Sequence, residues 1–99
     1  MLPFAVEGWQ LQCEEIAVDR ILDIRPVEGF LRAHLEGAES VPYTDFQDDV
    51  EGLLEAGQAV LVVDSGGARA AEMAMWLKQR GHDAAYLKGG MSGWSGELA

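Results

Sequence analysis

The sequence is poor in cysteine and in basic residues, and each shortage excludes a class of protein. Cys13 is the single cysteine, so no disulfide can form within the chain, and no Cys/His set has the spacing of a zinc site. Lys and Arg number 7 against 17 Asp and Glu, a formal net charge of −10. Nucleic acids and anionic membrane surfaces are therefore not expected as partners, because phosphate binding needs clustered cations.

Long hydrophobic runs are absent as well. A membrane-spanning helix needs roughly 20 consecutive apolar residues, and every apolar run here is far shorter. The segment 1–7 has no basic region and meets Pro3 and Glu7 early, which is unlike a secretory signal peptide. We therefore expect a cytoplasmic protein. A chain of 99 residues, 48% hydrophobic and without a linker-like stretch, is expected to form one domain over residues 1–99.

Short apolar segments alternate with segments of helical periodicity. The strands are expected at residues 20–24, 37–42, 59–63 and 84–87. Residues 59–63 are apolar at every position, as in the middle of a parallel sheet that is covered on both faces. Arg25 precedes a proline, and this disfavours helical backbone there and ends the first strand.

Helices are expected at residues 27–35, 44–56 and 68–80. Thr44 is the expected N-cap of the second helix. The third carries small and apolar residues on one face and ends before Gly81. Strands that alternate with helices of this length indicate an α/β protein with a mainly parallel sheet.

A glycine-rich loop joins the strand at 59–63 to the third helix. It reads Asp64-Ser65-Gly66-Gly67-Ala68-Arg69. In open α/β sheets ligands bind at this end of the strands, and two glycines allow successive N–H groups to converge on an anion. Arg69 is expected at the rim of the loop or behind it. The pattern also fits a tight connection with no ligand, and it lacks the motifs of nucleotide-binding loops. A small anion is the candidate ligand; no cofactor and no metal are expected.

Three segments carry motifs that resemble those of the rhodanese family. The first signature is found in Leu22-Asp23-Ile24-Arg25, His34-Leu35-Glu36-Gly37-Ala38 and Val41-Pro42. The closing signature is found in Leu87-Lys88-Gly89-Gly90-Met91-Ser92-Gly93-Trp94, and the loop before Arg69 falls where the family has its active-site loop. The resemblance implies a rhodanese-like fold, a mostly parallel sheet of about five strands with helices on both faces.

The chain departs from the family at the position that carries the chemistry. Active rhodaneses have a cysteine on the last strand residue, then four residues, then an arginine. Counting back from Arg69 places Asp64 at the cysteine position. Rhodanese chemistry needs a thiolate that attacks a sulfane sulfur and holds it as a persulfide, and a carboxylate cannot form one.

The resemblance therefore implies a homologue of the sulfurtransferases with an inactive loop and no assigned catalytic residue. We expect it to act as a binding or regulatory module for a protein partner. The alternative is a thiosulfate sulfurtransferase that uses another thiol, either Cys13 or a cysteine of a partner. Cys13 itself is expected to be a small apolar filler near the amino-terminal strand.

Asp64 has three alternative roles. Its carboxylate is expected to accept hydrogen bonds from the N–H groups of the loop, so that the site is occupied by the chain's own anion. In a second reading Asp64 faces solvent. In a third it accepts a phosphoryl group beside a metal ion, with Asp23 as a further ligand.

Other polar residues are expected to be structural. His34 is expected to bond within the fold, and Asp23 and Arg25 to pair or to bind backbone groups at the strand end. Trp94 is expected to pack the last short helix against the core. The acidic run 45–55 is interpreted as a solvated helix face or as a surface for a basic protein.

Overall fold

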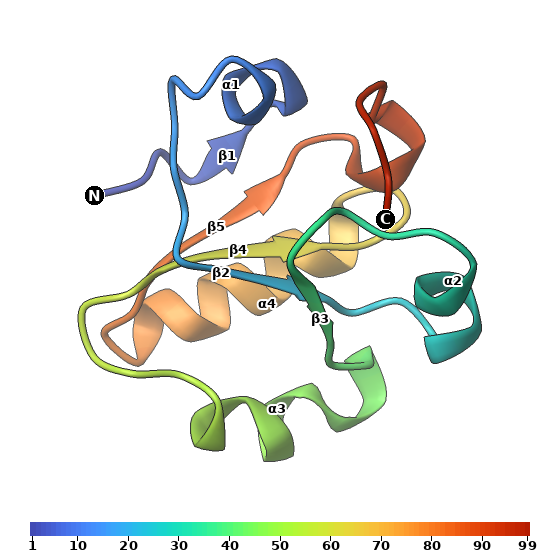
Figure 1. Cartoon of the computed structure of the whole chain (residues 1–99). Coiled ribbons are helices and arrows are strands. Elements are labelled where there is room, and N and C mark those ends of the chain that lie inside the picture. The colour runs from blue at the N-terminus through green and yellow to red at the C-terminus, as the bar shows by residue number, and fades with distance from the viewer.

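The computed structural model describes residues 1–99 as a five-stranded sheet with helices on both faces (Figure 1). The strand order is β1-β5-β4-β2-β3, and every neighbouring pair is parallel. The strands are β1 (Ala5–Val6), β2 (Arg20–Asp23), β3 (Ala38–Ser40), β4 (Ala59–Val63) and β5 (Asp83–Leu87). The expected α/β class and parallel sheet are confirmed.

β4 lies at the centre of the sheet, and its buried residues alternate between two cores. Val60 and Val62 pack in one cluster, while Leu61 and Val63 pack in the cluster on the opposite face. All four are fully buried. This explains why the strand is apolar at every position. The carboxyl ends of β2 and β4 lie side by side, because Asp23 is in register with Val63.

The first core lies beneath α4 (Ala68–Gln79), whose buried face is made by Ala70, Met73, Ala74 and Leu77. The expected helix at 68–80 is confirmed to within one residue at its end.

The expected continuous helix at 44–56 is wrong. The chain instead forms a 3₁₀ turn (Tyr43–Asp45), a one-turn helix α3 (Phe46–Asp49) and a second 3₁₀ turn (Val50–Gly52). Thr44 makes no capping hydrogen bond. Phe46 and Val50 are fully buried in the first core and hold these turns in place. Repulsion between the acidic residues disfavours a longer regular helix, since like charges four apart destabilise it.

The second core lies on the opposite face, beneath α1 (Gly8–Gln12) and the segment that ends the chain. α2 (Val27–Arg32) stops short of the expected end at Leu35, because Ala33 takes an extended conformation that lets Leu35 enter this core. Cys13 follows the last turn of α1 and is exposed, so the expectation of a buried filler is wrong; Leu11 packs on the core instead. No helix has both the length and the apolar character needed to cross a membrane.

Candidate functional site

The loop between β4 and α4 begins with Asp64, directly after the last residue of the central strand. Only 8% of Asp64 is exposed. Gly67 has φ of 106°, a left-handed conformation that glycine adopts readily, and it is the residue before the first turn of α4. The loop therefore folds back over the strand end and directs the N–H groups of α4 toward Asp64.

The carboxylate of Asp64 accepts three backbone hydrogen bonds. Its Oδ1 accepts from the N–H of Gly67 at 2.5 Å. Its Oδ2 accepts from the N–H groups of Arg69 at 3.0 Å and of Ala70 at 3.1 Å. These donors belong to the start of α4, where backbone N–H groups have no partner within the helix. The hydrogen bonds expected for Asp64 are therefore present, and the reading in which Asp64 faces solvent is wrong.

A second glycine-rich segment supports the loop from behind. The N–H of Met91 donates to the carbonyl of Asp64 at 2.8 Å, and the N–H of Ser92 donates to the carbonyl of Ser65 at 3.0 Å. Gly90 has φ of 58°, and a Cβ there would lie 2.5 Å from the carbonyl carbon of Ser65. Only glycine permits this close approach of the two backbones, which explains why residue 90 is a glycine.

The side chain of Arg69 lies at the rim of the loop. Its guanidinium carbon is 4.7 Å from the centre of the Tyr43 ring. The hydroxyl of Tyr43 donates to Glu72 at 3.0 Å, and this hydrogen bond is the main reason that the pKa of Tyr43 is raised above its usual value. Tyr43 and Glu72 were not predicted, because they belong to different elements and share no sequence motif with Arg69.

A hollow of about 260 Å³ opens beside the loop. Its lining residues follow the ends of β2 and β4 or lie in the first turn of α4: Ile24, Arg25, Pro26, Asp64, Ser65 and Arg69. Arg25 does not extend freely into it, because its Nη2 donates to Asp23 at 2.7 Å and to the carbonyl of Ala33 at 2.7 Å.

Asp23 is fully buried and accepts hydrogen bonds from both the backbone and the side chain of Arg25. The predicted pairing of these two residues is confirmed. The carboxylate of Asp23 is thus committed to the strand end rather than to a site shared with Asp64. Moreover, no three His, Cys, Asp or Glu side chains are arranged so as to hold a metal ion. The phosphoryl-acceptor reading therefore gains no support from the neighbouring side chains.

His34, Trp94 and Cys13 all lie outside the lining of this hollow. His34 stacks on Phe30 with ring centres 3.9 Å apart, and its Nδ1 lies 2.8 Å from the carbonyl of Phe30. Trp94 packs against the second core after the last 3₁₀ turn. Both structural roles are confirmed. The Sγ of Cys13 lies 4.0 Å from the carbonyl of Gln10, on the exposed end of α1.

Comparison with known proteins gives a consistent result at the level of family and fold. Residues 7–97 match the sequence model described as "Rhodanese-like domain". No curated protein gives a significant match.

Several solved structures share the fold. A rhodanese-related protein from Thermoplasma volcanium superposes with a TM-score of 0.86 at 19% identity, covering 96% of each chain. A rhodanese-like domain protein from Staphylococcus aureus gives a TM-score of 0.83 at 23% identity, covering 96% of this chain and 95% of that one. The rhodanese-like domain of an Anabaena protein gives 0.85 at 24% identity, covering 99% of this chain and 80% of that one.

Proposed function

This chain belongs to the rhodanese-like domain family, and we propose that it is a member without sulfur transfer that serves as a binding or regulatory module for a protein partner. The observation that carries this proposal is the environment of Asp64. A carboxylate stands at the end of β4 and is already bound by three backbone N–H groups of the loop.

The chemistry of sulfur transfer requires a different atom at this position. In an active member a thiolate attacks the outer sulfur of the donor, the sulfur–sulfur bond of the donor breaks, and the persulfide stays on the cysteine. A second nucleophile then takes the sulfur and regenerates the thiolate. Asp64 has no sulfur with which to hold that intermediate.

Electrostatics also argue against an anionic sulfur donor in this loop. Three N–H groups at the start of α4 that could help to stabilise an incoming anion already donate to Asp64. The carboxylate adds a negative charge at the same place, so thiosulfate would meet repulsion and occupied donors. The guanidinium of Arg69 lies over the ring of Tyr43 at the rim of the loop, and the hydroxyl of Tyr43 donates to Glu72. The support for the proposal is thus an anion site that the chain fills by itself.

Sulfur transfer from thiosulfate to cyanide tests the proposal directly. We expect the natural protein and the variant Cys13→Ser to form thiocyanate only at the rate of a protein-free blank. Asp64→Cys restores a thiol within reach of the same N–H groups, so we expect it to gain activity and to carry a persulfide detectable by mass spectrometry. The variant Asp64→Ser is the matched control, with a small polar side chain and no thiol.

The competing reading is a sulfurtransferase that works through Cys13. In that case the natural protein would form thiocyanate and Cys13→Ser would abolish it. This result would refute the proposal. Activity that appears only in Asp64→Cys would support it, because it would locate the missing step at residue 64.

A further inference from the structure

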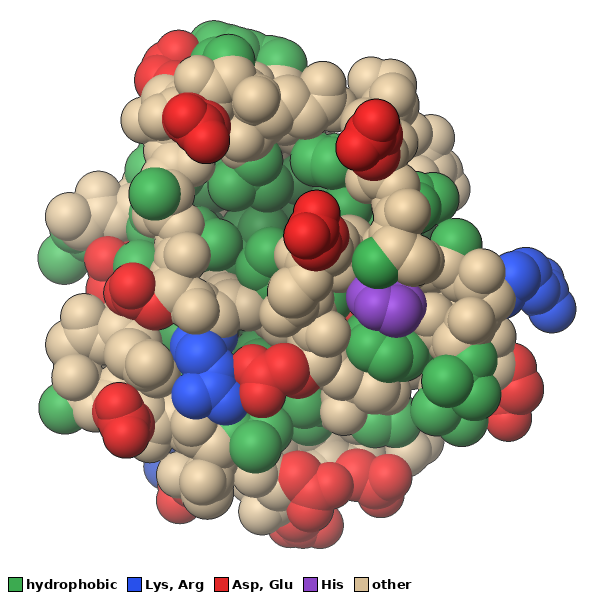
Figure 2. Space-filling model, viewed as in Figure 1, with side chains coloured by type: hydrophobic (Ala, Val, Ile, Leu, Met, Phe, Trp, Pro, Cys, Tyr) green, Lys and Arg blue, Asp and Glu red, His purple; other side chains and the backbone are tan.

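The face of the sheet opposite α4 carries a groove that is separate from the loop. Its volume is about 820 Å³, within the range of protein ligand sites. Its walls come from residues 11–18, from residues 35–36 and from residues 94–97, and it shares no residue with the hollow at Asp64. Figure 2 shows it as an opening with an apolar floor and acidic side chains around its margin. We call this feature the acidic-rimmed groove.

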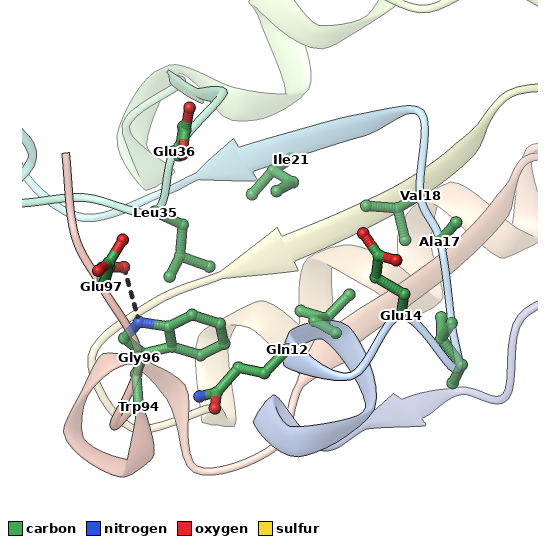
Figure 3. Close-up of a pocket in the computed structure, with 12 residues that line it drawn as sticks. Gln12, Glu14, Ala17, Val18, Ile21, Leu35, Glu36, Trp94, Gly96 and Glu97 are labelled. Carbon is green, nitrogen blue, oxygen red and sulfur yellow. Dashed lines mark hydrogen bonds between the residues drawn. The ribbon is translucent and has the colours of Figure 1, made fainter.

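The floor of the groove is apolar. Val18, Ile21 and Leu35 lie toward the opening in Figure 3, and all three belong to or pack against the second core. Trp94 forms one wall. Its indole is held in place because the backbone of Gly96 lies against it; a Cβ on Gly96 would come within 2.7 Å of a ring carbon. Val18, Ile21 and Trp94 are partly exposed and present apolar surface to solvent, whereas Leu35 is almost completely buried and supports this surface as part of the second core.

The groove exists because part of the sheet lacks a covering helix. α1 lies above β1 and α2 beyond the opposite side, and no helix lies over β2 between them (Figure 1). Parallel sheets normally have helices packed on both faces. β2 is paired with a strand on each side, so it offers no free backbone edge to the groove. The space above Ile21 therefore suits a helix better than an extended strand.

The rim is acidic and unpaired. Glu14, Glu36 and Glu97 line it, and no Lys, Arg or His does. The three ion pairs of the chain use other carboxylates, and no side-chain hydrogen bond engages these three. Glu14 adopts φ of 61°, and its carboxylate lies over the opening (Figure 3). Any occupant must therefore bring apolar surface for the floor and positive charge for the margin.

We infer that the acidic-rimmed groove binds a helix of a partner protein whose apolar stripe is flanked by Lys or Arg. The stripe packs on Val18, Ile21 and Trp94, and the basic side chains reach the three glutamates. Charge selects the orientation and the partner, while the apolar floor supplies most of the affinity. This inference rests on the proposed function, because it names the partner chemistry of the binding module.

The test is a titration of the full ¹⁵N-labelled chain with a synthetic helical peptide, followed by NMR. The probe has leucines at positions i, i+3, i+4 and i+7 with lysines on either side. We expect shifts of the amides of Val18 and Ile21 and of the indole N–H of Trp94, which donates to the carbonyl of Glu97 at 3.2 Å. A peptide of the same composition with its leucines dispersed, and one with glutamate in place of lysine, are expected to bind far more weakly.

A matched pair of variants distinguishes the effect of the groove's own charges on peptide binding from the effect of the protein's overall negative charge. The triple variant E14Q/E36Q/E97Q removes the charges of the rim and is expected to weaken binding about tenfold, because exposed ion pairs each contribute modestly. The control D45N/D48N/D49N removes three charges at and beside α3, on the other face, and is expected to change binding less than twofold. All six side chains are exposed, so both variants should fold.

Several results would overturn the inference. These are shifts confined to other surfaces, equal binding of the dispersed peptide, equal weakening by both triple variants, or a simple alkylammonium ion that binds as tightly as the peptide. Concentration-dependent shifts at the groove without peptide would mean that a second copy occupies it. The thiocyanate assay reports separately on the loss of sulfur transfer, so failure of the groove and failure of the proposed function are distinguishable.

Discussion

Removal of the Asp64 carboxylate should destabilise the fold and open the loop to a free anion. In Asp64→Ala the N–H groups of Gly67, Arg69 and Ala70 lose their acceptor. Loss of a helix cap costs about 0.5–2 kcal/mol, and donors left without a partner in a nearly buried position cost about 1–3 kcal/mol. We expect a loss of about 2 kcal/mol, because water can reach part of the vacated space. That loss would lower the Tm by roughly 8–16 °C for a domain of this size.

Sulfate should then reverse part of the loss. An anion that binds only the folded variant stabilises it by RT ln(1 + [L]/Kd), about 1.4 kcal/mol at ten times the dissociation constant. The assay is thermal unfolding with rising sulfate, with chloride at equal ionic strength as the salt control. Sulfate also stabilises proteins in general, so the natural chain and Asp48→Ala, which removes an exposed carboxylate, give the baseline. An Asp64→Ala variant as stable as Asp48→Ala, or an equal response of all three proteins to sulfate, would refute the reasoning.

Other substitutions test the structural framework. Gly90→Ala should cost about 2 kcal/mol or more in urea unfolding, because its Cβ would overlap the loop backbone, whereas Gly52→Ala, with open space around it, should change stability by less than about 0.5 kcal/mol. Arg25→Ala should cost about 3–5 kcal/mol by leaving a fully buried Asp23 without its cation, and the double variant Asp23→Ala/Arg25→Ala should cost less than the sum of the single ones. Cys13→Ser should leave the unfolding free energy within about 0.5 kcal/mol, because the thiol is exposed.

The sequence predicted best those elements whose local pattern and long-range packing agree. β4 forms over the predicted residues because it is apolar on both faces. α4 forms within one residue of its predicted bounds, because its stripe of small and apolar residues favours a helix and the glycine after it favours an end there. For β4 and α4 the local signal was strong enough to need no knowledge of the neighbours. For Asp64 the place before a glycine-rich turn predicted an acceptor of loop N–H groups but left other roles open, and its burial and its three hydrogen bonds excluded the solvent-facing one.

Features that depend on contacts between distant segments could not be read in this way. The region after Thr44 has helical periodicity, but burial of Phe46 and Val50 divides it into short turns. The stacking of Arg69 on Tyr43 joins two elements with no shared motif. The acidic-rimmed groove is assembled from three segments, none of which is unusual in composition by itself.

The short edge strands limit how this domain can join another chain. β1 has two residues and β3 has three, whereas strands are usually about five or six residues long. A foreign strand would find little main chain to hydrogen-bond at either edge, and Arg20 and Glu39 already form a two-point ion pair across the β3 side. Extension of the sheet by an incoming strand is therefore disfavoured. Partners must therefore be recognised by side chains on the faces of the molecule. The short edges also disfavour nonspecific edge-to-edge pairing of sheets from different chains.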